Sequence, residues 1–240
     1  YDKLILSPGA SAVRPPLPGV ERAYVLRSVT DLDRLKAALA QRGPDVVVIG
    51  AGFIGVEVAE NLQEAGKRVN VVEATPQVLP PLDPEMASFV ADELRSHGVA
   101  VHLGVGVSAI EDDAVVLADG RTLRADVVVL AVGVRPEDGL ARAAGLDVHE
   151  RGGILINDSL QTSDPDIYAV GDATLVKDAL GNTSFVALAW GRLGGDGLVL
   201  RRLGRHRDAQ QHHQYQGANG HGGLQGAATS PSMISGRKGG

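Results

Sequence analysis

Three glycines and one glutamate have the spacing in this chain that most directly suggests chemistry. Gly50, Gly52 and Gly55 fit the pattern G-x-G-x-x-G, and Glu73 follows 23 residues after the first glycine. The first glycine permits a tight turn, the second lets backbone approach a pyrophosphate, and the third lets a helix pack close to a strand. An apolar run at 45–50 precedes the loop and a helical pattern follows it, which is the context this motif requires. The spacing therefore predicts a dinucleotide-binding loop, against the alternative of glycines that serve turns and packing alone.

The residues around this loop indicate which dinucleotide it binds. Phe53 and Ile54 open the predicted helix, whose free N–H groups attract phosphate. Glu73 ends the next predicted strand, where a carboxylate accepts hydrogen bonds from ribose hydroxyls and repels a 2′-phosphate. No Arg or Lys follows it directly, since the next residues are Ala-Thr-Pro. We therefore expect NADH to be preferred over NADPH, with a solvated strand-end acid as the alternative for Glu73.

A second stretch, TSDPDIYAVGDAT, ends an apolar run at 167–170 with Gly171 and Asp172. The aspartate is expected at the carboxyl end of a strand, where α/β proteins bind ligands. An Asp that caps a following helix is the competing interpretation.

Strands and helices alternate between residues 45 and 134, which predicts an α/β fold with a parallel sheet. Apolar runs predict strands at 45–49, 68–73 and 99–104, and a central strand at 127–131. The pairs Asp112-Asp113 and Asp119-Gly120 divide the intervening segment into a β-meander. Shorter strands are expected at 4–6, 154–156 and 167–170.

Three helices are expected to cover this sheet. The helix at 28–43 begins at Thr30 or Asp31 and ends at Gly43. A second helix spans 53–65, and a third begins at Asp83-Pro84 and stops at Gly98. The apolar stripes predicted to be buried are Leu32, Leu35 and Leu39 in the first helix, and Met86, Phe89, Val90 and Leu94 in the third.

Composition excludes several classes of site. There are no cysteines, so this chain has no disulfide, thiolate metal site or catalytic thiol of its own. A net charge of −6 argues against nucleic acid as a partner. No apolar run is long enough to cross a bilayer, and no signal-peptide pattern opens the sequence. We expect no metal, no membrane contact and a cytoplasmic location.

Four stretches together resemble the flavin-dependent pyridine nucleotide–disulfide oxidoreductases. They are LILSPGA, the glycine motif with Glu57 shortly after it, LAVGVRPE, and TSDPDIYAVGDA, and they occur in the family's order within residues 1–190. The stretches VEATPQVLPPLDPEM and VGVRPEDGLARAAGL look most like the branch of coenzyme A-disulfide reductases and NADH oxidases.

This resemblance implies a Rossmann-like NAD-binding domain with a β-meander, inserted into a partial FAD-binding domain. It implies that Ser7, Pro8 and Gly9 belong to the FAD site together with Gly171 and Asp172. The glycine loop and Glu73 would bind NAD, Gly133 would line the path between nicotinamide and flavin, and Glu57 would lie near the nicotinamide. For Glu57, an ordinary helix acid is the alternative.

The resemblance also implies the domain boundaries. We expect FAD-domain segments at 1–43 and 150–190, an NAD-binding domain at 44–149, and a disordered tail at 191–240. The family's FAD glycine motif, redox cysteine and C-terminal dimerisation domain are not in this sequence, which we therefore interpret as a fragment of a parent homodimer. The tail carries seven basic residues against two acidic ones, and four histidines, His206, His212, His213 and His221. We interpret it as a non-native translation rather than as a metal site.

The expected activity is that of an FAD- and NAD-dependent oxidoreductase. Hydride would pass from NADH to FAD, and electrons then to a small-molecule disulfide, persulfide or dioxygen. No residue is identified as a catalytic acid, base or nucleophile. The alternatives are an inactive NADH-binding module without a complete flavin site, and a flavoprotein of the ferredoxin, rubredoxin or nitrite reductase type.

Overall fold

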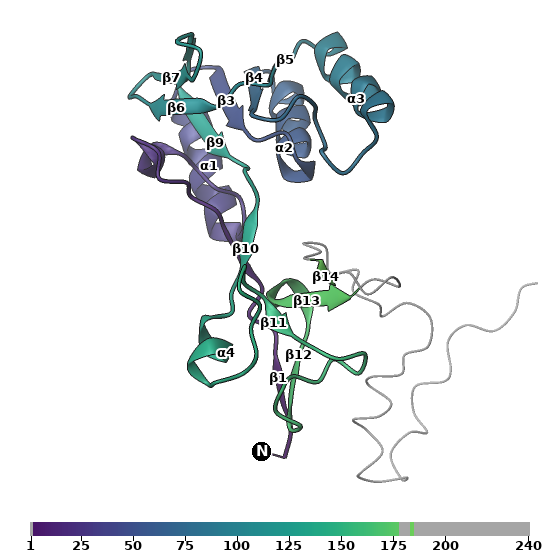
Figure 1. Ribbon diagram of the computed structural model, residues 1–240. Coiled ribbons are helices and arrows are strands. Elements are labelled where there is room, and N and C mark those ends of the chain that lie inside the picture. The colour runs from purple at the N-terminus through teal and green to yellow at the C-terminus, as the bar shows by residue number, and fades with distance from the viewer. Residues whose placement is uncertain (1, 178–182, 185–240) are drawn as a thin grey trace, which may run out of the picture. The chain divides into compact units, whose positions relative to one another are not determined.

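The computed structural model describes residues 2–177 and 183–184. All of them belong to one compact structural unit, Tyr1–Asp196. Residues 191–240, with the predicted disorder and the four histidines, lie outside this described part. The fold is α/β, as expected (Figure 1). None of the helices that the described residues form is long and apolar enough to span a membrane.

A four-stranded parallel sheet in the order β5-β4-β3-β9 forms the predicted nucleotide-binding region. Its strands are β3 (Asp45–Ile49), β4 (Arg68–Glu73), β5 (Ala100–Leu103) and β9 (Val127–Leu130). Every residue of β3 and β9 is buried, which explains their continuous apolar sequences. The prediction that β9 is central was wrong. It ends the four-strand order, and beyond it Tyr24 makes one isolated bridge to Val129.

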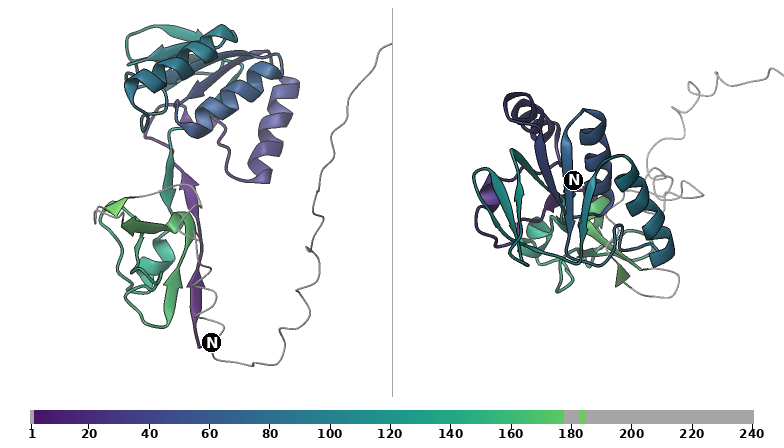
Figure 2. Two further views of the ribbon diagram at one scale, coloured as in Figure 1. Left: turned by 90° about the vertical axis from the view of Figure 1, so that its right-hand side faces the viewer. Right: turned by 90° about the horizontal axis from the view of Figure 1, so that it is seen from above.

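The two faces of this sheet carry different layers (Figure 2). Val46, Val48 and Val71 face the helices α1 (Val29–Gln41), α2 (Phe53–Glu64) and α3 (Pro84–Ser96). Val47, Ile49 and Val72 face the opposite side, toward the predicted meander. The meander consists of β6 (Val107–Ile110), β7 (Ala114–Leu117) and β8 (Thr122–Arg124). Because side chains alternate along a strand, successive valines are buried in different cores.

Helix α1 starts earlier than predicted. Its N-cap is Ser28, whose hydroxyl accepts a hydrogen bond from the Asp31 amide while the Asp31 carboxylate accepts one from the Ser28 amide. This reciprocal capping box satisfies two backbone donors and places Asp31 in the first turn. The Ser28 hydroxyl and amide, which hydrogen-bond to the Asp31 carboxylate, lower its pKa. Leu32 is 41% exposed, so the buried stripe is Leu35 and Ala38.

Helix α3 buries only part of the predicted stripe, since Leu94 is buried and Val90 packs against the same core, whereas two other members of the stripe do not. Met86 and Phe89 are 56% and 70% exposed, while Ala87, Ala91 and Leu94 are buried. The alanines bring the helix backbone close to the sheet, and larger side chains on that face would hold it away. The large apolar residues Met86 and Phe89 were therefore a misleading guide to the inner face of this helix.

The N-terminal and later segments form separate small sheets. Strand β1 (Leu4–Leu6) pairs in parallel with β12 (Ile167–Ala169), and β2 (Ala10–Ala12) pairs antiparallel with β10 (Val134–Pro136). Strand β13 (Thr174–Lys177) lies between β11 (Ile154–Leu155) and β14 (Thr183–Ser184). Residues of β1, β11, β12 and α4 (Gly139–Ala143) form a third core that includes Leu6, Ala141 and Ile154. The short helices η1 (Val20–Arg22) and η2 (Gly171–Ala173) complete the described elements.

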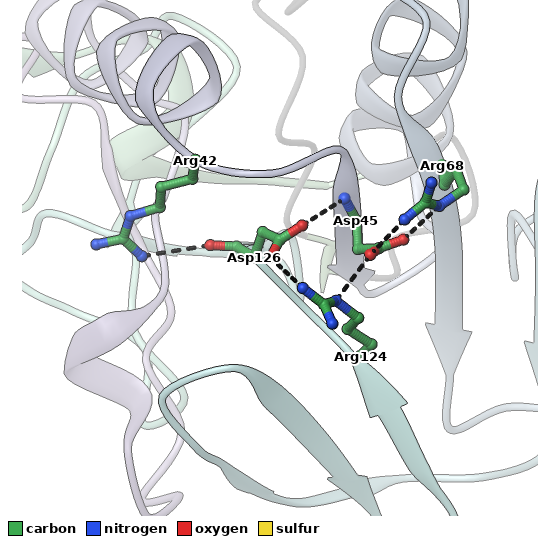
Figure 3. A network of polar contacts seen from close by, with 5 residues as sticks. All are labelled: Arg42, Asp45, Arg68, Arg124 and Asp126. Carbon is green, nitrogen blue, oxygen red and sulfur yellow. Dashed lines mark hydrogen bonds and ion pairs between the residues drawn. The ribbon is translucent and has the colours of Figure 1, made fainter.

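An ion-pair network connects neighbouring strands at the edge of the sheet opposite the glycine loop (Figure 3). Asp45 opens β3, and its carboxylate accepts two hydrogen bonds from Arg68, at 2.6 and 2.7 Å. Arg124 contacts the same carboxylate at 3.0 Å, and the Asp126 carboxylate accepts a hydrogen bond from the Asp45 amide. These contacts join β3, β4 and the β8–β9 turn.

Candidate nucleotide-binding site

The glycine loop joins β3 to α2 in a conformation that two of its glycines make possible. Gly50 has φ +101°, a region that other residues rarely adopt. A Cβ atom placed on Gly55 would lie 1.9 Å from the Gly50 carbonyl oxygen, so only glycine fits this crossing without a shift. The roles predicted for the first and third glycines are thus visible in the backbone.

Gly52 differs from its neighbours because its missing side chain faces open space. It is the N-cap of α2, and a Cβ atom placed on it would meet nothing within 4 Å. The next residues, Phe53 and Ile54, are 53% and 41% exposed. The first N–H groups of an α-helix have no partner within the helix and attract anions. The backbone at Gly52 therefore forms an open cradle suited to a pyrophosphate.

Glu73 ends β4 beside this cradle and is half-buried. Its Oε2 accepts a 2.8 Å hydrogen bond from the Ala51 amide. Its Oε1 accepts hydrogen bonds from the amide and the hydroxyl of Thr75, at 2.8 and 2.9 Å. The carboxylate that the sequence singled out is thus held against the glycine loop.

A cavity of about 880 Å³ connects these groups with the turn after β9. It is mainly apolar, and among the described residues that line it Glu73 is the one acidic residue and none is basic. Gly133, with φ +108°, lines this cavity, and its predicted place between nicotinamide and flavin stays a prediction. Of the residues predicted for the nucleotide site, the cavity wall includes Gly50, Gly52, Phe53, Ile54, Glu73 and Gly133.

Two predicted residues do not reach this wall. Gly55 is buried where α2 crosses the loop and acts through packing. Glu57 is exposed on the second turn of α2 and is not part of the cavity lining. Its proposed place near the nicotinamide stays a prediction.

Sequence reasoning missed two segments that shape the cavity. Pro15, Pro16 and Leu17 form part of its wall, although the sequence showed only a stiff proline-rich connection. The segment after β4 contributes Pro80, which follows Leu79. Leu79 has φ +45° and donates a 2.8 Å hydrogen bond from its amide to the Ala51 carbonyl. A leucine in the left-handed region carries no sequence signal, so this contact was not predictable.

The residues predicted for the flavin site come together at the carboxyl ends of β1 and β12. Ser7, Pro8 and Gly9 follow β1, while Gly171 and Asp172 follow β12. A Cβ atom placed on Gly171, which has φ +75°, would lie 3.7 Å from the Ser7 hydroxyl. Among the described residues, the buried Oδ1 of Asp172 has no hydrogen-bond partner. A buried acceptor of this kind fits a ligand hydroxyl.

Within the described residues, no three His, Cys, Asp or Glu side chains form a group that could hold a metal ion. His102 lies on β5 with its Nε2 3.0 Å from the Asn70 side-chain oxygen. Burial lowers the pKa of His102, and the nearby Arg121 charge acts in the same direction. Since it lies outside the cavity wall, we assign it a structural role.

Comparison with known proteins connects this geometry to a family. The chain is 40% identical over 178 residues to the nitric oxide reductase FlRd-NAD(+) reductase of Aeromonas hydrophila, which covers 72% of this chain and 45% of that protein. A reduced CoADR-RHD from Bacillus anthracis superposes with a TM-score of 0.76 and 45% identity, covering 79% of this chain and 35% of that one.

A water-forming NADH oxidase from Lactobacillus brevis, solved with NADH bound, has a TM-score of 0.74 and 27% identity. That match covers 79% of this chain and 43% of the oxidase. The chain thus spans less than half the length of each of these three proteins. The model of the pyridine nucleotide-disulphide oxidoreductase family matches residues 1–198. The chain therefore belongs to the pyridine nucleotide-disulphide oxidoreductase family, as its four sequence stretches indicated.

Proposed function

We propose that this chain binds NADH at the loop from Gly50 to Gly55 and contributes part of the FAD site of an NADH-dependent oxidoreductase. The observation that carries the proposal is the Glu73 carboxylate, which is held beside the open backbone of Gly52 in a cavity of about 880 Å³. When bound, NADH supplies a hydride and FAD accepts it.

The chain's own residues bind and orient these groups. The amides at the start of α2 face the position of a pyrophosphate, and the open side of Gly52 leaves room for it. Glu73 accepts hydrogen bonds from ribose hydroxyls and repels a 2′-phosphate, which favours NADH over NADPH. The described residues that line the cavity include no basic side chain, which supports the same preference.

The flavin assignment rests on Asp172. Its unpartnered Oδ1 fits a hydroxyl of the ribityl chain, and Ser7 and Gly171 lie next to each other at the same strand ends. Residues 1–43 and 150–190 would then be FAD-domain segments around an NAD domain at 44–149. The relatives' names specify different reactions, from FlRd reduction to water formation. We assign the acceptor by class as a disulfide, persulfide, dioxygen or small redox protein, and the parent protein as a homodimer.

Titration calorimetry on the purified chain tests the nucleotide assignment. We expect NADH to bind and NADPH to bind at least about tenfold more weakly, because the Glu73 charge faces its extra phosphate. Absence of NADH binding, or a preference for NADPH, would overturn the proposal.

Flavin absorbance and NADH oxidation with a dye acceptor test the redox assignment separately. Yellow, active protein supports the oxidoreductase. Colourless protein that still binds NADH, even after incubation with FAD, supports an NADH-binding module instead.

A further inference from the structure

Thr75 lies two residues beyond the end of β4. It makes two of the three hydrogen bonds that the Glu73 carboxylate accepts from the described part of the chain. Its amide and its hydroxyl both reach Oε1, at 2.8 and 2.9 Å. The hydroxyl also lies 3.0 Å from the Gln77 carbonyl oxygen. A hydroxyl has one proton, and a charged carboxylate is the stronger acceptor, so this proton is directed to Glu73.

The backbone of Thr75 is itself held in place. Its carbonyl accepts a 2.9 Å hydrogen bond from the Gly104 amide, and the Glu73 carbonyl accepts one from the Val105 amide at 3.1 Å. Both donors follow β5 in the chain. The Thr75 side chain therefore donates from a fixed position, although the residue is exposed.

The other carboxylate oxygen meets an equally fixed donor. The Ala51 amide donates to Oε2, while the Ala51 carbonyl accepts a hydrogen bond from Leu79 at 2.8 Å. A carboxylate oxygen accepts about two hydrogen bonds. Thr75 occupies both positions on Oε1, whereas the described residues leave one acceptor position on Oε2, beside the cavity that Glu73 lines.

From these contacts we infer that Thr75 is a positioning residue for nucleotide selection. The Thr75 hydroxyl holds Oε1 of Glu73 away from the ribose, so that Oε2 of Glu73 faces the ribose hydroxyls. In this way Thr75 contributes to the preference for NADH over NADPH. This inference rests on the proposed function and adds Thr75, which does not line the cavity itself and acts through its hydrogen bonds to Glu73.

Calorimetric dissociation constants for NADH and NADPH test the inference in Thr75→Val, which keeps the shape and the amide but lacks the hydroxyl. We expect NADH to bind about threefold to tenfold more weakly, the equivalent of one hydrogen bond, with NADPH binding unchanged or tighter. Thr75→Ser should restore the wild-type ratio. Thr122→Val, at an exposed site on β8, is the matched control and should leave both constants unchanged.

A double-mutant cycle with Glu73→Gln tests whether Thr75 acts by positioning the Glu73 carboxylate or affects nucleotide binding in general. In that background, Thr75→Val should no longer change the ratio of the two constants, because the charge it positions is gone. An unchanged ratio in the single variant, or an equal loss of affinity for both nucleotides, overturns the role of Thr75 but leaves the proposed function intact. A wild-type chain without NADH preference overturns both.

Discussion

Gly50 and Ala131 follow neighbouring strands, β3 and β9, and their backbones lie so close that a Cβ atom on Gly50 would be 2.4 Å from the Ala131 carbonyl oxygen. The Ala131 amide also donates a 2.7 Å hydrogen bond to Ile49. This contact brings the glycine loop to the turn that contains Gly133. The two sides of the cavity are therefore positioned by backbone contact at the carboxyl ends of two strands.

Gly50→Ala should damage both the fold and nucleotide binding. The new side chain would meet the Ala131 backbone, and alanine is strained at φ +101°. Strain of this kind alone costs about 1–3 kcal/mol. We expect a lower free energy of unfolding by denaturant titration and a loss of NADH binding by calorimetry.

Gly52→Ala should separate binding from stability. Gly52 has φ −72°, which any residue adopts, and its Cβ position is open. The melting temperature should stay near that of the wild type, while NADH affinity falls on the order of tenfold because the methyl group occupies the pyrophosphate cradle. Unchanged affinity would show that the phosphates lie elsewhere.

Asp172→Ala should stabilise the chain when no flavin is bound. Its buried Oδ1 has no partner among the described residues, and an unsatisfied buried acceptor costs about 1–3 kcal/mol. Thermal unfolding should therefore occur at a higher temperature in the variant, and added FAD should shift that temperature less than in the wild type. A variant that unfolds earlier without flavin would mean that Asp172 has a structural partner.

Local patterns predicted the strands of the parallel sheet and the glycine loop, because both depend on residues that are adjacent in sequence, whereas the short strands β2, β10, β13 and β14 were not predicted. The alternation of Val46, Val47 and Val48 between two cores follows from strand geometry, and Gly50 is required by the turn itself. Glu73 was identified for the same reason, since the end of a strand is visible in the sequence.

The sequence could not reveal contacts that tertiary packing decides. Whether β9 is a central or an edge strand depends on which strands pair with it. A buried apolar strand has the same kind of sequence at both positions. Met86 and Phe89 were wrongly assigned to the inner face of α3 because they are large and apolar, whereas the small Ala87 and Ala91 are buried there instead. Thr75 was read only as a non-basic neighbour of Glu73, because its hydroxyl contact depends on the turn after β4.

Asp45→Asn should change how stability depends on pH. Hydrogen bonds from Arg68 hold the pKa of the Asp45 carboxyl below its ordinary value of about 3.9, and the Arg124 charge adds to this effect. A lowered folded-state pKa contributes stability above about pH 4, which is lost as the pH falls through the lowered value.

We therefore expect Asp45→Asn to unfold at a lower temperature than the wild type at pH 7, with the difference shrinking as the pH falls below about 4. Asp92→Asn is the matched control. Asp92 pairs with Arg95 on the surface of α3 at 2.9 Å and is 74% exposed, so its loss should change little at any pH. A difference for Asp45→Asn that is constant with pH would contradict the ion-pair explanation.

The face that α3 buries can be tested with two truncations on the same helix. Leu94 is 7% exposed and packs in the core with Ala87 and Ala91, so Leu94→Ala should lower the free energy of unfolding by about 2–5 kcal/mol. Phe89 is 70% exposed, so Phe89→Ala should change it by about 0.5 kcal/mol or less. Alanine also favours the helix, which offsets any lost contact. Denaturant titration of both variants measures the contrast, and equal losses would mean that Phe89 is buried together with Leu94, as the sequence predicted.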